Sequence, residues 1–141
     1  MNKPFGKMKL KCKQRPYYFN IYLWDTHKEF QYKTHYGENT LGCCKFTPVL
    51  EDLHKDERRP WKPKLGEIHL IKDKWSLEIV SHELCHALLL RLDILKPRFN
   101  EAIPTDNAEL YESICYEFGI WVETVYGWLW QINPSKKWRK K

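Results

Sequence analysis

Apolar and polar residues alternate, or apolar residues cluster, in four segments before residue 75, and each pattern predicts a β-strand. Residues 17–25 are rich in aromatic and β-branched side chains. Residues 29–36 place Phe30, Tyr32 and Thr34 on one side, residues 41–49 end near Pro48, and residues 65–73 alternate again. The charged, proline-rich segment 51–64 between the last two predicts a loop.

Two longer segments repeat their apolar residues at helical spacing. The first predicts a helix over 76–93, with Ser76 as N-cap and an apolar stripe at Leu77, Val80, Leu84 and Leu88. The second predicts a helix over 106–130 that Thr105 or Asp106 caps; its apolar face comprises Ile114, Phe118, Trp121, Val125 and Leu129. Strands followed by two long helices predict one α+β domain spanning residues 1–141.

The formal charge of +6 is concentrated at the two ends of the chain. The first fifteen residues contain basic side chains and no acid, and the last six are KKWRKK. We expect mobile, solvated ends over about residues 1–14 and 134–141. The alternative use of these ends is a weak contact with nucleic acid.

The cysteines are odd in number and two are adjacent, which argues against a disulfide framework and favours a reducing compartment. Cys43 and Cys44 read as strand residues, and Cys85 as a small core residue. No apolar run suits a signal peptide or a bilayer span, so the sequence predicts a cytoplasmic protein, in a host cytoplasm if phage-encoded, with no membrane contact.

The sequence HELCH, residues 82–86, carries the most specific chemical signal. On a helix, His82 and His86 project from the same side one turn apart, so that both imidazoles can bind one metal ion, and Glu83 can reach a water on that ion. The alternative is a pair of hydrogen-bonded histidines in the core, because the surrounding residues are almost all apolar and the imidazoles are expected on a buried face.

A hydrolytic zinc site needs a third protein ligand, and no histidine follows His86. A carboxylate is therefore expected; those available are Asp93, Glu101, Asp106, Glu109, Glu112, Glu117 and Glu123. Glu112 is preferred, since Gly119 on the same helix would allow close approach to the histidine helix, and Glu109 is the alternative.

These segments resemble the zincin metallopeptidases, most closely the small phage-type metallopeptidases and more distantly the ImmA/IrrE type. The resemblance covers residues 65 to about 126 and rests on GEIHLIKD, IVSHELCHALL and ELYESICYEFG. It implies a zincin-like fold, in which a small mixed or antiparallel sheet packs on the HExxH helix and a long C-terminal helix.

The resemblance also implies Zn²⁺ held by His82, His86 and Glu112, with Glu83 as the general base for a zinc-bound water. Tyr116 is a candidate oxyanion donor from its position beside Glu112. The edge of strand 65–73 could pair with an extended substrate, and His69 either faces the cleft or lies at an exposed edge.

Two functions follow from this sequence. The first is a zinc-dependent metallopeptidase that hydrolyses an intracellular protein or peptide. The alternative is a zincin-fold binding or regulatory module, for a protein partner or nucleic acid, whose metal site is structural or inactive.

Overall fold

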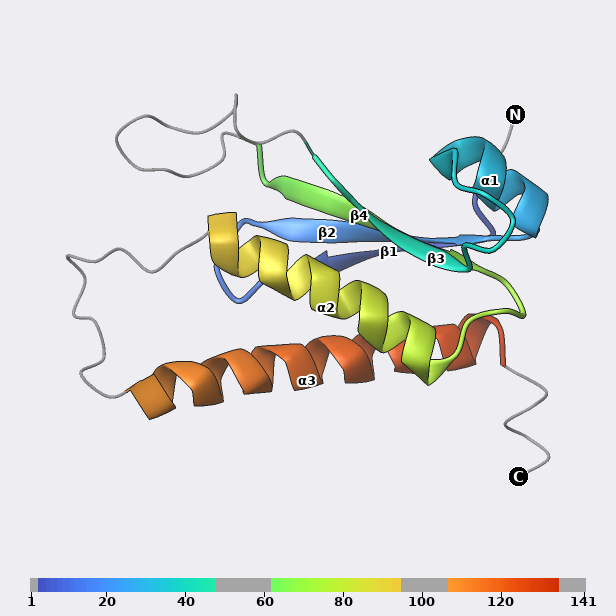
Figure 1. Cartoon of the computed structure of the whole chain (residues 1–141). Coiled ribbons are helices and arrows are strands. Elements are labelled where there is room, and N and C mark those ends of the chain that lie inside the picture. Colours follow the sequence, from blue (N-terminus) through green and yellow to red (C-terminus); the bar gives the residue numbers. More distant parts are fainter. Residues whose placement is uncertain (1–2, 48–61, 95–106, 135–141) are drawn as a thin grey trace.

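The computed structural model describes residues 3–47, 62–94 and 107–134 of the chain. Its elements are β1 (Gly6–Lys11), β2 (Tyr18–Trp24), α1 (His27–Thr34), β3 (Gly42–Phe46), β4 (Lys64–Ile71), α2 (Leu77–Ile94) and α3 (Asn107–Ile132). The fold is α+β, as predicted: one sheet forms a layer above α2 and α3, and α1 lies on the other side of the sheet at one end (Figure 1). In these described ranges, no helix is long and apolar enough to cross a membrane.

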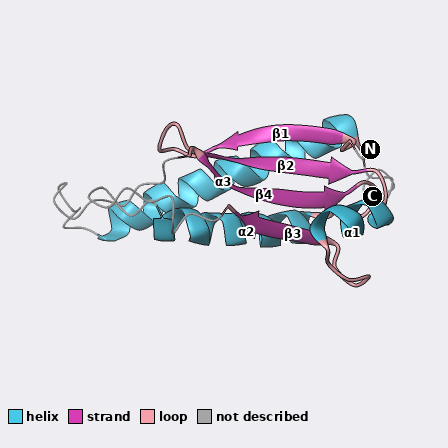
Figure 2. Ribbon diagram, turned by 90° about the horizontal axis from the view of Figure 1, so that it is seen from above, coloured by secondary structure: helices cyan, strands magenta, loops and turns pink. Residues whose placement is uncertain are grey.

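The sheet is mixed and has the strand order β1-β2-β4-β3. β2 and β4 form a parallel pair at its centre, whereas β1 and β3 pair antiparallel to them as the two outer strands. Seen from above, β3 runs along the edge that lies over α2, and β1 forms the opposite edge (Figure 2). The strands predicted over 17–25, 41–49 and 65–73 correspond to β2, β3 and β4.

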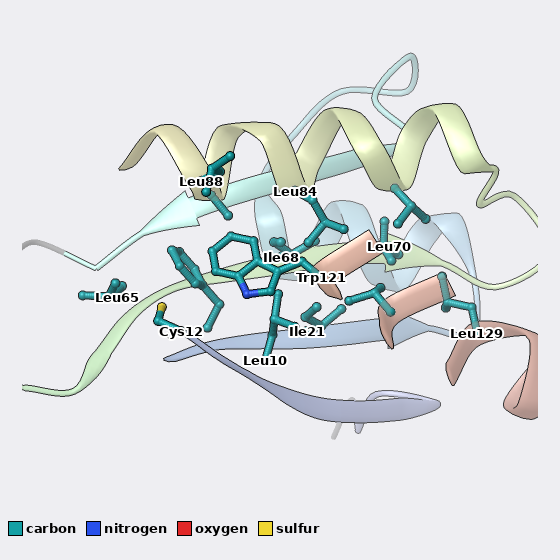
Figure 3. Close-up of a cluster of buried hydrophobic side chains, with 14 of the residues drawn as sticks. Leu10, Cys12, Ile21, Leu65, Ile68, Leu70, Leu84, Leu88, Trp121 and Leu129 are labelled. Atoms are coloured by element: carbon teal, nitrogen blue, oxygen red, sulfur yellow. The ribbon is translucent and has the colours of Figure 1, made fainter. Parts of the chain in front are cut away.

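The core lies between one face of the sheet and the two long helices. Trp121 of α3 is 1% exposed and occupies its middle, with Leu84 of α2 on one side and Ile21 of β2 on the other (Figure 3). The edge-to-face contact between Trp121 and Phe19 has a ring-centroid distance of 5.8 Å. Burial of these large apolar side chains is the main stabilising term that fixes both helices to the sheet.

The prediction of a strand over 29–36 is wrong, because these residues form α1. Thr26 caps the helix by accepting a hydrogen bond from the backbone N–H of Glu29 at 3.1 Å. His35 ends it in the left-handed region, with φ of 63°. Phe30 and Thr34 are buried, whereas Tyr32, which a strand would place on the same side, is 72% exposed, so the helical spacing and not the alternation determines the structure here.

The prediction that residues 1–14 form a mobile end is also wrong, since residues 6–11 form the edge strand β1. Met8 and Leu10 face the core, and Lys7, Lys9 and Lys11, which alternate with them, face away from the helices. The lysines therefore occupy ordered positions in a sheet. Residues 135–141 lie outside the described part, as do Thr105, Asp106 and nearly all of the predicted loop 51–64.

We call the sheet face opposite α2 and α3 the open face; Figure 2 shows it directly, with α1 over one end. His69 of β4 lies on it and is 1% exposed, which corrects the expectation of a cleft or exposed-edge position. Its ring is nearly parallel to that of Tyr22, with centroids 5.0 Å apart, and its Nδ1 accepts a hydrogen bond from the Trp24 indole N–H at 2.9 Å.

The other nitrogen of His69 is engaged by Glu67. Because Nδ1 accepts from Trp24, Nε2 carries the proton and donates it to Oε1 of Glu67 at 3.0 Å. Lys64 forms an ion pair with Oε2 of the same carboxylate. The hydrogen bond from His69, followed by the Lys64 ammonium, holds the pKa of Glu67 at about 2, although burial acts in the opposite direction.

A second polar cluster joins the end of α3 to the turn between β4 and α2. Oδ1 of Asn133 accepts hydrogen bonds from the Trp75 indole N–H at 2.7 Å and from the backbone N–H of Asp73 at 2.9 Å. Nδ2 of Asn133 donates to the Asp73 carboxylate at 2.9 Å. Asp73 has φ of 65°, so this cluster holds a strained turn that directs the chain into α2.

Candidate functional site

The apolar stripe of α2 determines which way the HELCH residues point. Ser76 caps the helix through its Oγ, which accepts from the backbone N–H of Ile79 at 3.2 Å, as predicted. Val80, Leu84 and Leu88 are buried against the sheet and α3, whereas Leu77, the first predicted residue of the stripe, is 42% exposed.

The two imidazoles lie on the outer side of α2 and are exposed, so the expectation of a buried histidine face is wrong. Their Nε2 atoms are 3.2 Å apart and form a hydrogen bond, as the alternative predicted, and the rings meet edge to face with a centroid distance of 4.8 Å. Two Zn–N bonds of about 2.0–2.1 Å that meet at a tetrahedral angle separate their nitrogens by about 3.3–3.4 Å. The spacing of His82 and His86 therefore fits two ligands of one tetrahedral ion.

Glu83 is the buried member of the motif and is 7% exposed. No described residue donates a hydrogen bond to its carboxylate, in contrast to Glu67 and Glu117, which are fully engaged. Burial raises the pKa of Glu83 above its ordinary value, and the nearby His82 and His86 oppose this shift. The Glu83 carboxylate therefore accepts a proton more readily than an exposed glutamate does.

Glu83 and the two histidines line one wall of a cleft with a volume of about 320 Å³. The facing wall belongs to β3 and the segment before it; its residues are Tyr36, Thr40, Gly42, Cys43, Cys44 and Phe46. Sequence reasoning did not identify this wall. The available signal was Gly42, because a glycine inside a strand often marks a close approach.

Gly42 allows β3 to lie against α2. A Cβ at this position would be 2.9 Å from Cγ2 of Ile79 and 3.3 Å from Cγ of Glu83. The absence of a side chain at Gly42 thus lets the strand run directly past the Glu83 carboxylate.

The edge of the sheet that borders this cleft belongs to β3 and not to β4. β4 is hydrogen-bonded to β2 on one side and to β3 on the other, so the expected pairing of a substrate with strand 65–73 is wrong. In the described sheet, β3 is an edge strand, and its residues line the cleft together with the histidines.

The structure does not bring the expected third ligand to the histidines. The described ranges contain no group of three histidine, cysteine or acidic side chains that could hold a metal ion. Glu112 is exposed on α3, Tyr116 is 66% exposed, and neither lines the cleft. The side chain of Glu109 lies outside the described part, so Glu112 and Glu109 as third ligand, and Tyr116 as oxyanion donor, stay predictions.

Gly119 does not serve the close helix approach on which the preference for Glu112 depended. It is exposed, and a Cβ built on it meets nothing within 4 Å. That part of the sequence interpretation is wrong.

The buried acid of α3 is Glu117, which joins three parts of the chain. Nε of Arg91 on α2 lies 3.2 Å from its Oε1 and 3.3 Å from its Oε2. The backbone N–H of Lys13 also donates to Oε2, at 2.9 Å. Both partners of the ion pair are buried, so Glu117 connects the histidine helix to α3 and to the segment that follows β1.

The cysteines fall into two environments. Burial, followed by the charge of Glu83, raises the pKa of Cys44 in the cleft wall to about 12, and burial likewise raises the pKa of Cys12 and Cys43 to about 12. Cys85 and Cys115 are exposed, so the expectation that Cys85 fills the core is wrong.

Comparison with known proteins adds no identification. No family model matches the chain, and neither a curated protein nor a solved structure matches it. The function must therefore be argued from the site itself.

Proposed function

We propose that this protein is a zinc-dependent metallopeptidase of the zincin type, acting on an intracellular protein or peptide. The observation that carries the proposal is the combination on one helix of two imidazole nitrogens 3.2 Å apart with a buried carboxylate between them in sequence. All three side chains line the same cleft.

The state of Glu83 favours catalysis over a purely structural site. A carboxylate that only stabilised the fold would be paired, as Glu117 is with Arg91. Glu83 is equally buried, has no hydrogen-bond donor among the described residues, and faces the cleft beside the histidines.

His82 and His86 are the residues that would hold the zinc ion, together with Glu112 or Glu109 as the predicted third ligand. When bound, zinc supplies Lewis-acid chemistry, which makes water more acidic and polarises a carbonyl. Glu83 takes a proton from the attacking water and later gives it to the leaving amine. Its low exposure keeps bulk water from competing for the carboxylate during this transfer.

The free edge of β3 supports a peptide as substrate. An extended segment can add to a sheet edge through main-chain hydrogen bonds, which places its backbone beside the adjacent cleft. Gly42, Cys44 and Phe46 alternate along β3 on the cleft side, so they would contact the substrate in that position.

The decisive experiment compares zinc content with hydrolysis of an unfolded protein such as casein. We expect the wild type to bind one zinc ion and to cleave, and Glu83→Gln to retain zinc while its rate falls by about 10²–10⁴-fold. His86→Ala should lose both. The matched control is Glu78→Gln, which removes an exposed acid from the first turn of the same helix.

Two outcomes would contradict the proposal: full activity in Glu83→Gln, or a wild type that binds no supplied zinc. If the wild type and Glu83→Gln both bind zinc but the wild type hydrolyses no protein, the result would favour the alternative, a zincin-fold binding or regulatory module. Comparing Glu112→Gln with Glu109→Gln for zinc affinity identifies the third ligand.

A further inference from the structure

The open face of the sheet differs in composition from an ordinary solvent-exposed sheet surface. The alternation of β1 places Lys7, Lys9 and Lys11 on it in a row, because Met8 and Leu10 point into the core. Lys45 of β3 and Lys64 of β4 belong to the same face. Across the four described strands, Glu67 is the one acidic residue; Lys64 forms an ion pair with it, and His69 donates a hydrogen bond to it.

Aromatic rings of β2 lie directly beside the lysine row. Nζ of Lys9 is 4.2 Å from the ring centroid of Tyr18, and Nζ of Lys7 is 5.4 Å from that of Tyr22. Tyr18 and Tyr22 are both partly exposed. Since they are four residues apart on one strand, their rings are about 13 Å apart along it.

The ring of Tyr22 already has two aromatic neighbours. His69 lies nearly parallel to it, with an interplanar angle of 13° and centroids 5.0 Å apart, and Trp24 lies at 20° and 6.1 Å. Nζ of Lys7 is the cation over this ring, and its side chain is exposed and can move aside. Because Tyr22 is partly exposed, a planar group could extend this cluster of rings once the ammonium has moved to a neighbouring anion.

We infer that the open face binds single-stranded nucleic acid, with phosphates on the β1 lysines and bases stacked on Tyr18 and Tyr22. The argument is one of complementarity: a row of cations suits a phosphate backbone, and rings with an accessible face suit unpaired bases. A duplex keeps its bases stacked on one another, so it can use the lysines but not the rings. This binding is independent of the cleft, which lies on the other side of the sheet, and does not depend on the proposed peptidase activity.

The test measures fluorescence anisotropy of labelled oligothymidine and oligouridine of about 12 nucleotides, a length within the range that small folds cover. Full-length protein carrying Glu83→Gln serves as the background, so that proteolysis cannot affect the readout. We expect saturable binding to single strands and weaker binding to a duplex of equal length. Comparing the two oligonucleotides shows whether the face prefers this DNA or this RNA strand.

The lysine contribution is tested with two variants of equal net charge. Lys9→Gln/Lys11→Gln removes two charges from β1, and Lys28→Gln/Lys74→Gln removes two exposed charges from α1 and from the turn before α2. Each phosphate contact contributes about 0.7 to the slope of log affinity against log salt concentration, so the β1 pair should lower this slope by about 1.4. Between about 50 and 200 mM salt, the affinity of the β1 variant should therefore fall about sevenfold less than that of the wild type. The control pair should keep the wild-type slope.

The stacking contribution is tested without a change in charge. Tyr18→Leu should weaken single-strand binding by about 5- to 150-fold and leave the urea midpoint unchanged. Tyr32→Leu on α1, at a side chain that is 72% exposed, should change neither the binding nor the urea midpoint. Equal binding of duplex and single strands, equal effects of the two lysine pairs, or wild-type affinity in Tyr18→Leu would each overturn the inference.

Discussion

The carboxylate of Glu67 should make the stability of this protein depend on pH in a defined range. Its folded pKa of about 2 lies below the ordinary value of 4.5. A group with a lowered folded pKa stabilises the native state above its unfolded pKa, and this contribution is lost as pH falls through the folded value. The stabilisation should therefore be complete above about pH 5 and absent near pH 2.

The size of the effect follows from the same shift. A difference of about 2.5 pKa units corresponds to about 3.4 kcal/mol, which is an upper limit. Glu67 is 24% exposed and Lys64 32% exposed, so solvent screens part of the interaction and about 2 kcal/mol is expected. Glu67→Gln keeps an acceptor for His69 but removes the charge. At pH 7 its urea midpoint should fall by about 1 M for a slope of about 2 kcal/mol per M.

The assay is urea unfolding of wild type and Glu67→Gln, followed by tryptophan fluorescence at pH 7, 5, 3.5 and 2.5. The difference in unfolding free energy between the two proteins should be constant from pH 7 to 5 and should approach zero by about pH 2. Asp25→Asn is the control, because Asp25 is 53% exposed and pairs with Lys72 at 3.4 Å, a contact worth less than about 0.5 kcal/mol. A difference that persists unchanged to pH 2.5 would refute the electrostatic explanation.

Three further predictions concern the packing around the cleft. Gly42→Ala should lower the rate of peptide hydrolysis more than it lowers the thermal midpoint, because the added methyl group displaces β3 from Glu83; equal loss of both would contradict this, as would no loss. Glu117→Gln should destabilise the fold by about 3–5 kcal/mol in urea unfolding, since Arg91 is left buried without a counter-charge, and a change below about 1 kcal/mol would count against it. A thiol reagent at pH 8 should modify the exposed Cys85 and Cys115 quickly in the native protein and all five cysteines after unfolding; rapid reaction of the buried Cys12 in the native protein would show that the core opens.

The elements with strong periodic patterns were predicted well. β2, β4, α2 and α3 agree with the sequence to within about two residues, because each buries a continuous apolar face. α1 was missed since its eight residues also alternate, and only the cap at Thr26 and the left-handed His35 reveal the helix. β1 was missed since its lysines obscured an alternation that just two apolar side chains define.

The motif predicted that His82, Glu83 and His86 lie together on one helix, but not that the two imidazoles are exposed. His82 lies two residues before Leu84, about 160° away around the helix, so the apolar stripe already required the imidazole to point outward. The wall formed by β3 could not be inferred in this way, because it depends on which strand occupies the edge of the sheet. That choice is made by pairing between residues far apart in the chain.

The Asn133 cluster has a consequence for the order in which the protein matures during synthesis. The turn that sets the direction of the histidine helix is completed by a side chain 60 positions later. While a ribosome still covers residue 133, the Trp75 indole N–H and the backbone N–H of Asp73 lack the acceptor that Asn133 supplies in the folded protein. The direction of the histidine helix is thus completed only after the chain beyond α3 has been synthesised.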